Sequence, residues 1–461
     1  MSILAGFMVP HPPLIVPAVG RGGEAQIVET TRAYEKVAEE IARIAPETII
    51  IPSPHTIMYA DYFHMPSGSE GKGSFANFGA GEVRFHETYD TELRDKVIEL
   101  AKKTDFPTGT LGGRDPALDH GVMVPLWFIR KKYDGFKILR LGLSGLPLAK
   151  HYELGQMIAG AVRETGRRAV IVASGDLSHK LQDYGPYGFA PEGPEYDEKI
   201  MDVMGRVAFG ELFDFSESFC EKAAECGHRS FVIMAGAFDG LNVKAEILSH
   251  QDVTGVGYGV GMFWPGEPNE ERHFLKIYQD KTSSELALKR SKEDAYVRLA
   301  RLSLETYIRE GRRIKAPGDL PAELTNARAG AFVSIHEDGR LRGCIGTIEP
   351  TRATLAEEII NNAISASTQD PRFDAITEDE LDMLEINVDV LGEAEDIDSM
   401  DQLDVRRYGV IVTSGYRRGL LLPDLDGVDT VEQQVDIARR KAGIGPKEKI
   451  ELKRFEVIRH V

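Results

Sequence analysis

Short apolar runs that alternate with helical patterns are the feature that most constrains the fold of the first part of this chain. Apolar runs of strand length occur at Ser2–Val9, Thr48–Ile51, Phe136–Leu143, Ala169–Ala173 and Val243–Leu248. Helical patterns occur between them, at Glu24–Ile44, Thr91–Lys102, Tyr152–Glu164 and Phe231–Phe238. Strands that alternate with helices form a sheet with parallel pairs, which the helices cover. The pattern therefore predicts an α/β sheet domain with flanking helices.

The chain changes character near residue 265. Trp264–Glu271 is rich in proline, glycine and acidic residues and predicts a linker. A charged helical stretch over Ser284–Glu310 follows it. Short strands and helices then occur at Gly330–His336, Thr354–Ala366, Leu384–Leu391, Gly409–Thr413 and Thr430–Ala442. A length of 461 residues accommodates two or three domains. We expect an α/β domain over residues 1–268 and a smaller α+β domain over residues 280–461.

Charge and composition exclude several classes of partner. The chain has 55 basic and 73 acidic residues, which gives a formal net charge of −18. Nucleic acids and anionic membranes bind cationic surfaces, so we expect neither as a partner. No run of about 18 apolar residues occurs, so we expect no membrane-spanning helix. Three cysteines fit a reducing compartment, and the N-terminal segment lacks the basic region of a secretory signal. We therefore expect a cytoplasmic protein.

Three histidines follow expected strands after short loops. His11 lies in VPHPP, His55 in PSPHT and His179 in SGDLSH. Ligands of open α/β sheets bind at the carboxyl ends of the strands, so these three imidazoles can share one site. Prolines beside His11 and His55 restrict their loops, as a metal ligand requires. The alternative is that each histidine only bonds a backbone carbonyl, but the shared placement of all three favours a metal site.

Two further segments carry candidate residues. Asp119 and His120 open DHGVMVPL, which suits either a polar group beside a substrate or a helix N-cap by the aspartate. Glu225 and Cys226 are adjacent in AECGHR. Two histidines with a carboxylate form the triad of non-haem Fe(II) oxygenases, whereas a thiolate favours Zn or Cu(I). The residues alone leave both third ligands open. Asp176, within SGDLSH, is expected to stabilise a turn.

These motifs resemble those of a known family. PHPP, PSPHT, DHGVMVPL and SGDLSH occur in this order within about residues 1–265. Together they resemble the class III extradiol dioxygenases, the LigB-like family of protocatechuate 4,5-dioxygenase, and the related Memo proteins. The resemblance implies His11 and His55 as metal ligands, His179 as the acid/base histidine, and His120 as a polar residue near the substrate or oxygen. The third ligand is a glutamate in the dioxygenases and a cysteine before glycine in Memo proteins, which Cys226 matches.

The second part of the chain resembles the AMMECR family. The matching phrases are LRGCIG at Leu341–Gly346, DPRF at Asp370–Phe373, EINVDVL at Glu385–Leu391 and GLLLPDL at Gly419–Leu425. The resemblance covers about residues 285–461. Memo-like and AMMECR-like domains occur together in the AmmeMemoRadiSam set, beside a radical-SAM protein. A radical-SAM protein is therefore an expected partner, and a homo-oligomer is also compatible with the sequence.

The sequence supports three hypotheses for function. The first is a non-haem Fe(II) oxygenase that acts with O2 on a catecholic or related aromatic substrate, in which His179 transfers protons. In this hypothesis His120 stabilises charge that develops on bound oxygen. The second is a Memo-like metal-binding accessory protein without turnover, for which Zn or Cu is an alternative to iron. The third is a metal-assisted hydrolase, since an open metal–water site beside His179 suits that chemistry too.

Overall fold

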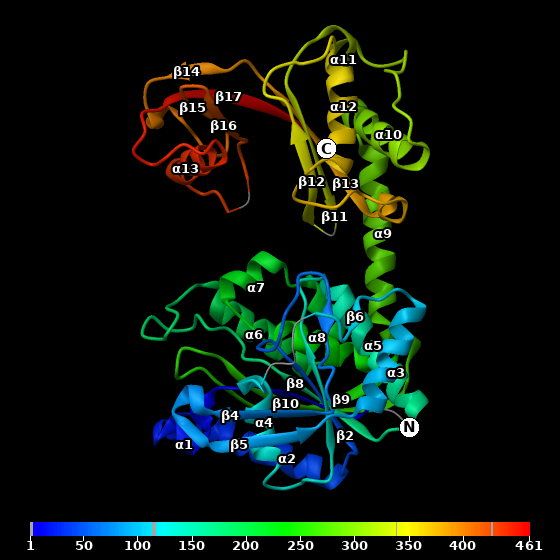
Figure 1. Cartoon of the computed structure of the whole chain (residues 1–461), viewed down its shortest axis with the longest axis vertical. Helices are drawn as coiled ribbons and strands as arrows, with labels where there is room; N and C mark the ends of the chain where they lie inside the picture. The colour runs from blue at the N-terminus through cyan, green and yellow to red at the C-terminus, as the bar shows by residue number, and fades with distance from the viewer. Residues whose placement is uncertain (1–2, 113–116, 338, 426) are drawn as a thin grey trace. The chain divides into compact units, whose positions relative to one another are not determined.

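The computed structural model describes residues 3–112, 117–337, 339–425 and 427–461, so Ser2 of the first expected strand lies outside the described residues. The chain divides into two compact units, Met1–Asp280 and Lys281–Val461. Each unit has its own sheet (Figure 1). The first unit has two hydrophobic cores, and the second unit has cores of its own. None of the helices in the described ranges combines the length and apolarity that a membrane span requires.

The first unit is built on a mixed sheet with the strand order β7-β2-β8-β1-β10-β9. The strands are β1 (Ile3–Val9), β2 (Thr48–Ser53), β7 (Lys137–Gly142), β8 (Ala169–Ser174), β9 (Leu241–Gln251) and β10 (Tyr258–Pro268). Strands β7, β2, β8 and β1 run parallel, and β10 pairs antiparallel with both β1 and β9. The α/β fold class and its parallel pairs are confirmed.

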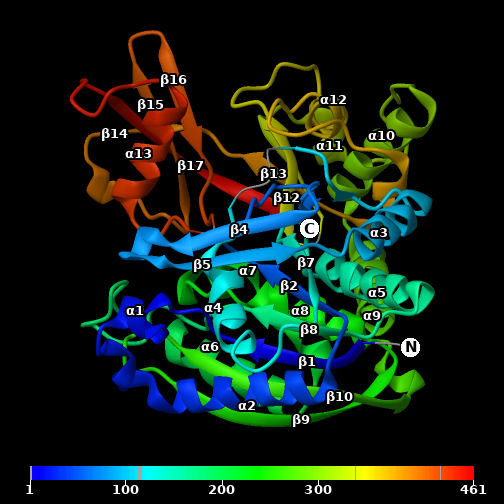
Figure 2. The same cartoon turned by 60° about the horizontal axis from the view of Figure 1, so that its bottom comes forward.

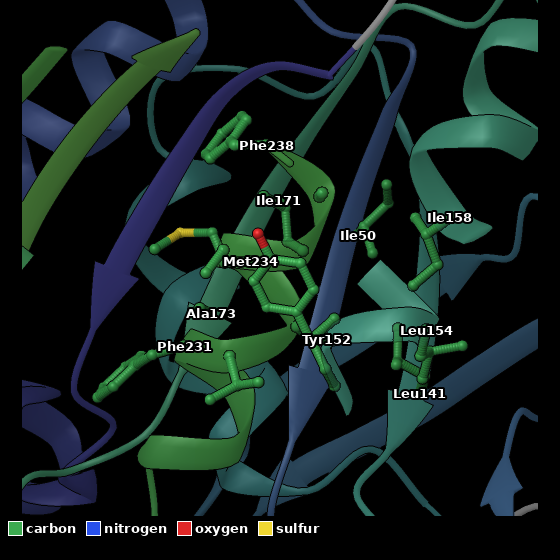
Figure 3. Close-up of a cluster of buried hydrophobic side chains, with 14 of the residues drawn as sticks. Ile50, Leu141, Tyr152, Leu154, Ile158, Ile171, Ala173, Phe231, Met234 and Phe238 are labelled. Carbon is green, nitrogen blue, oxygen red and sulfur yellow. The ribbon is translucent and has the colours of Figure 1, made fainter. Parts of the chain in front are cut away.

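Helices cover both faces of this sheet. One face carries α3 (Thr91–Lys103), α5 (Leu148–Thr165), α6 (Glu192–Gly205) and α8 (His228–Ala237), and the other carries α2 (Val28–Ile44) and α4 (His120–Ile129) (Figure 2). Successive residues of a strand point to opposite faces of the sheet. Ile50 therefore packs in the core under α5 and α8, and Ile49 and Ile51 pack in the core under α2 and α4. Figure 3 shows Ile50 among side chains of α5 and α8.

Smaller elements complete this unit. They are α1 (Pro17–Gly20), β3 (Phe63–His64), β4 (Glu70–Phe75), β5 (Ala80–Thr88), β6 (Thr108–Gly109) and α7 (Glu217–Ala223). Strands β4 and β5 form an antiparallel hairpin, and β3 pairs with β6. The sequence does not predict these short pairs, because they lack the apolar run that marks a buried strand.

The prediction of a linker over Trp264–Glu271 is wrong. Residues up to Pro268 belong to β10 and pair with β9, with Pro265 opposite Val243. The pairs between β1 and β10 end at Phe263 among the described residues, so a proline beyond that point interrupts no ladder on that side. The helix α9 (Phe274–Lys292) starts soon after.

The second unit is α+β, as expected, with an antiparallel sheet in the order β12-β11-β13-β17-β15-β16 and β14 beside β17 (Figure 1). Its strands are β11 (Ala331–Glu337), β12 (Arg340–Gly346), β13 (Leu384–Leu391), β14 (Glu395–Ile397), β15 (Tyr408–Ser414), β16 (Arg417–Leu421) and β17 (Glu451–His460). Its helices are α10 (Ala295–Glu310), α11 (Ala322–Asn326), α12 (Leu355–Thr368) and α13 (Val431–Lys441). Helices α10 and α12 pack on one part of the sheet, and α13 packs on β15 and β16.

The charged helical stretch expected over Ser284–Glu310 is interrupted. Helix α9 ends at Lys292 and α10 begins at Ala295. The carboxylate of Asp294 accepts hydrogen bonds from the amides of Tyr296 at 2.8 Å and Val297 at 3.1 Å. A short acidic side chain at this position caps a new helix and ends the previous one.

Helices α5 and α8 touch through their backbones at two glycines. A Cβ atom on Gly155 would lie 2.1 Å from the carbonyl oxygen of Ile233, and one on Gly236 would lie 2.0 Å from that of Tyr152. No side chain fits at such distances without moving a helix. The pair therefore fixes α8 against α5, and α8 begins directly after the segment that carries Glu225 and Cys226.

We predict that Gly155→Ala destabilises the protein by about 1–3 kcal/mol, because its new methyl group must push α8 away. The matched control is Gly160→Ala in the same helix, where the nearest atom to the new Cβ is 3.6 Å away. Alanine is the better helix former, so the control should stabilise by about 0.5–1 kcal/mol. Urea unfolding followed by circular dichroism measures both changes. Equal effects of the two substitutions would contradict the contact.

The start of α9 is fixed to the first unit by Asp239. The carboxylate accepts hydrogen bonds from the hydroxyl of Tyr152 at 2.8 Å, from Gln156 at 2.9 Å and from the amide of Phe274 at 3.1 Å. The ring of His273 lies 2.8 Å from the same carboxylate. This hydrogen bond raises the pKa of His273 above its ordinary value.

We predict that the pair of His273 and Asp239 stabilises the protein below about pH 6.5 and that this contribution is lost as the pH rises through the raised pKa of His273. The change should stay within about 1 kcal/mol, because the side chain of His273 is 40% exposed. In His273→Gln, the free energy of unfolding should differ less between about pH 6 and pH 9 than it does in the wild type. His86→Gln, at an exposed pair on β5, is the control that should keep it.

Candidate metal centre

The loops after three neighbouring parallel strands carry the predicted histidines to one edge of the sheet. His11 follows β1, His55 follows β2, and His179 follows β8, which lies between those two strands. The structure brings the rings of His11 and His55 together, with 2.8 Å between their Nε2 atoms. His11 is buried, whereas His55 is exposed. Both ring nitrogens therefore converge on one point that is open on the side of His55.

Cys226 completes this group. Its Sγ lies 3.6 Å from Nε2 of His11, and the donor atoms of His11, His55 and Cys226 all lie within 4.8 Å of one another. The cysteine lies in the turn before α8, which presses against the end of β8. A Cβ on Gly175 would lie 2.0 Å from Cα of Gly227, so Gly175 has no room for a side chain. The turn can reach the histidines only because of this close contact.

The carboxylate of Glu225 points elsewhere. It accepts a hydrogen bond of 2.6 Å from the amide of His228, at the first turn of α8. Burial raises its pKa, which favours the neutral acid. Within the described ranges, the groups of candidate metal donors include Cys226 and not Glu225. Adjacent residues on a turn point in different directions, so the two candidates left open by the sequence are separated by the fold.

A serine fixes which nitrogen of His11 faces the group. The hydroxyl of Ser174 donates to the carbonyl oxygen of Gly121 at 2.5 Å. Its oxygen is therefore free to accept from Nδ1–H of His11, which lies 3.0 Å away. With the proton on Nδ1, the lone pair on Nε2 is directed at His55 and Cys226. Such an outer hydrogen bond is the usual means by which proteins orient a metal-binding histidine.

Asp176 lies inside the site, which the sequence analysis missed. Its carboxylate accepts a hydrogen bond of 2.7 Å from the amide of His11 and belongs, with His179 and Cys226, to a second group of potential donors. Burial raises the pKa of Asp176, but its interactions with His11 and His179 outweigh burial and bring it to about 2. The residue therefore places a negative charge between the two histidines. The SGD pattern is the signal for Asp176 in the sequence, and it predicts only a turn.

His179 lies beside the donor group with one nitrogen already used. Its Nδ1 donates to the carbonyl oxygen of Ala224, and its Nε2 lies 3.7 Å from Oδ2 of Asp176. Burial lowers the pKa of His179, but the hydrogen bond and charge of Asp176 outweigh burial and raise it overall. The ring is thus held through Nδ1, and Nε2 faces the carboxylate of Asp176.

His120 stacks on His55 at 3.9 Å between ring centroids, and its centroid lies 5.2 Å from that of His11. It is the first residue of α4, whose N-cap is Asp119. The buried guanidinium of Arg140 donates to Asp119 at 3.1 Å and to the hydroxyl of Thr56, next to His55, at 2.6 Å. One cation therefore holds the segments of both His55 and His120.

The donor set fits a divalent metal ion. Burial lowers the pKa of His11 to about 3 and that of His120 to about 4, and it also lowers the pKa of His55. These imidazoles are neutral near pH 7, which leaves lone pairs to coordinate a cation. Burial and the neighbouring Asp176 raise the pKa of the Cys226 thiol. A bound cation opposes that shift, because it stabilises the thiolate.

Comparisons with known proteins agree on two families. Residues 5–261 match the family model described as the catalytic LigB subunit of aromatic ring-opening dioxygenase. Residues 297–460 match the AMMECR1 family model. The two matches lie in the first and second compact units, respectively.

Relatives cover either the whole chain or part of it. The protein CA_C1420 of Clostridium acetobutylicum is 40% identical over 471 residues, which are 100% of this chain and 99% of that protein. A protein of Thermotoga maritima is 51% identical over 170 residues, 36% of this chain and 98% of that protein. The crystal structure of the uncharacterized protein PH0010 from Pyrococcus horikoshii is similar with a TM-score of 0.34 and 32% identity, over 36% of this chain and 91% of that one.

We predict that Cys226→Ser loses bound metal and that Glu225→Gln retains it, because only the thiol lies beside His11 and His55. Ser174→Ala keeps all the donors but frees the ring of His11, so it should weaken the metal affinity about 10–100-fold. The measurement is metal content and affinity after anaerobic loading with Fe(II) and, separately, with Zn. Loss of metal in Glu225→Gln alone would instead identify the carboxylate as the ligand.

Proposed function

We propose that this chain, which belongs to the LigB family of aromatic ring-opening dioxygenase catalytic subunits and carries an AMMECR1 domain after it, is a metal-dependent oxygenase that acts on a catecholic or related aromatic substrate. The observation that supports this proposal best is the convergence of His11, His55 and Cys226 at the sheet edge, with His179 beside them. A group of three protein ligands with an exposed side leaves room for a substrate on the metal.

The proposed metal is Fe(II), held by His11, His55 and Cys226. When bound, it would supply open coordination positions for two substrate oxygens and for O2. Cys226 makes Zn or Cu the alternative, because thiolate favours those ions more than carboxylate does. Proton transfer and the stabilisation of developing charge are assigned to the side chains around the metal.

His179 is the proposed acid/base group. A ring-opening reaction must take a proton from a catechol hydroxyl and return one later, and an imidazole with a pKa near neutral does both. Nδ1 of His179 is occupied by the carbonyl oxygen of Ala224, so Nε2 is the nitrogen that transfers the proton. Asp176, 3.7 Å from Nε2, stabilises the imidazolium that forms. His120 is neutral and can donate one N–H to an oxygen where negative charge develops.

The test is O2 uptake by anaerobically Fe(II)-loaded protein with a panel of catechols. We expect uptake by the wild type and a loss of roughly 100-fold or more in His179→Gln, with unchanged iron content, because His179 transfers protons without binding the metal. His86→Gln, on β5 at an exposed pair with Glu70, is the control that should keep the wild-type rate. Absence of uptake with every catechol, from a fully iron-loaded sample, would overturn the oxygenase proposal.

The second candidate is a metal-binding accessory protein that works with a radical-SAM partner and has no turnover of its own. The observation that favours it is the thiol of Cys226 at the place where a carboxylate would complete an iron oxygenase site. This candidate expects tight Zn or Cu(I) binding that depends on Cys226, together with no O2 uptake after iron loading. O2 uptake with a catechol, lost in His179→Gln, would contradict it.

A further inference from the structure

Two exposed aromatic rings contact His120 and His179, the two histidines of the site that are not proposed as metal ligands. Phe78, in the short helix Ala76–Phe78 between β4 and β5, contacts His120 with 5.3 Å between ring centroids and 70° between ring planes. Tyr187 contacts His179 with 5.1 Å and 75°. Their exposed fractions are 38% and 61%. These rings come from segments about 110 residues apart and meet the same site.

Both rings are held in position by their own segments. The loop that carries Tyr187 is closed by a bridge between Leu181 and Phe189 and by a hydrogen bond of 3.2 Å from the amide of Leu181 to the carbonyl oxygen of Gly255. The ring of Phe78 packs at 6.2 Å from that of Phe75, which is fully buried. The fold therefore holds Phe78 and Tyr187 in exposed positions, where the faces and edges of their rings are available to a ligand.

We infer that Phe78 and Tyr187 bind the aromatic ring of the substrate and determine specificity for flat aromatic compounds. The inference rests on the proposed function, which supplies an aromatic substrate at the adjoining metal centre. A single exposed aromatic residue needs no explanation. Here each of two exposed rings instead contacts a histidine with a proposed role toward substrate. A planar ring held by its oxygens at the metal would cover these side chains and gain stacking or edge-to-face contacts.

A non-aromatic ligand with the same metal-binding oxygens would gain little from either residue. Phe78 carries no polar group, so it can only recognise apolar or aromatic surface. Tyr187 adds a hydroxyl, but the contact with His179 involves its ring. The two residues therefore discriminate by ring shape, whereas His11, His55 and Cys226 bind through the metal. This division allows a test that separates ring recognition from metal chemistry.

The experiment measures binding and not turnover. Zn-loaded full-length protein is titrated with 4-nitrocatechol, which has a ring and two metal-binding oxygens, and with acetohydroxamate, which has two such oxygens and no ring. We expect Tyr187→Leu and Phe78→Leu each to weaken 4-nitrocatechol binding about tenfold, which corresponds to about 1.4 kcal/mol. Acetohydroxamate binding and Zn content should stay unchanged.

Two controls separate the ring contact from general effects of the loop. Tyr184→Leu removes an equally prominent aromatic residue, 73% exposed in the same loop, for which the described residues show no ring contact with a site histidine. It should bind both probes as the wild type does. Tyr187→Phe keeps the ring and should also bind as the wild type does, which shows that the ring and not the hydroxyl carries the effect.

The outcomes are distinguishable. If the wild type binds 4-nitrocatechol and the two leucine variants bind it equally well, this inference is overturned and the proposed function stands. Equal weakening of both probes in the variants would also overturn it, because the residues would then act on the metal centre. If the wild type binds acetohydroxamate but not 4-nitrocatechol, the catecholic substrate itself is overturned, and the inference with it.

Discussion

The site depends on the parallel pairing of β1 and β2 with β8 between them. Three parallel neighbours send their following loops to the same edge of the sheet, about 5 Å apart from strand to strand. The pairing of Val9 with Ser174 extends into the loops, where the amide of Gly175 donates to the carbonyl oxygen of Val9 at 3.0 Å. The carboxylate of Asp176 then reaches the amide of His11. An antiparallel order would place His11 and His55 at opposite edges, and no donor group would form.

The choice between a carboxylate and a thiol depends on a second constraint, the contact of two backbones at Gly175 and Gly227. That contact brings the turn before α8 so close to β8 that the amide of Cys226 bonds the carbonyl oxygen of Asp176 at 3.3 Å. The side chain of Cys226 consequently points to His11, and that of Glu225 bonds the first turn of α8. Because the two residues are neighbours in the chain, local sequence could not distinguish them. The packing of α8 on β8 and α5 does so.

The sequence predicts more of the fold than of the site. Apolar runs identify β1, β2, β7 and β8, and the histidines after three of these strands follow from the topology of parallel sheets. The short-range pattern of Asp176, Gly-Asp after a strand, is typical of turns and predicts only a turn residue. Its approach to His11 joins residues 165 positions apart, which no local pattern reports. The stack of His120 on His55 is likewise a tertiary contact, made through the buried Arg140. The local pattern of β10 also leads to a wrong prediction. Its prolines indicate a linker, but they lie beyond the last residue that pairs with β1, where the strand still pairs with β9.

Burial acts on the donors of this centre in opposite ways. It keeps the imidazoles of His11 and His55 neutral, which prepares them to coordinate a cation, but it also keeps the thiol of Cys226 protonated. A divalent cation is therefore what makes the thiolate favourable in this position, and coordination has to release a proton. His55 is the exposed member of the donor group, whereas His11 is buried and hydrogen-bonded to Ser174 and Asp176. His120 stacks on His55, so a second neutral imidazole lies directly beside the exposed member of the donor group.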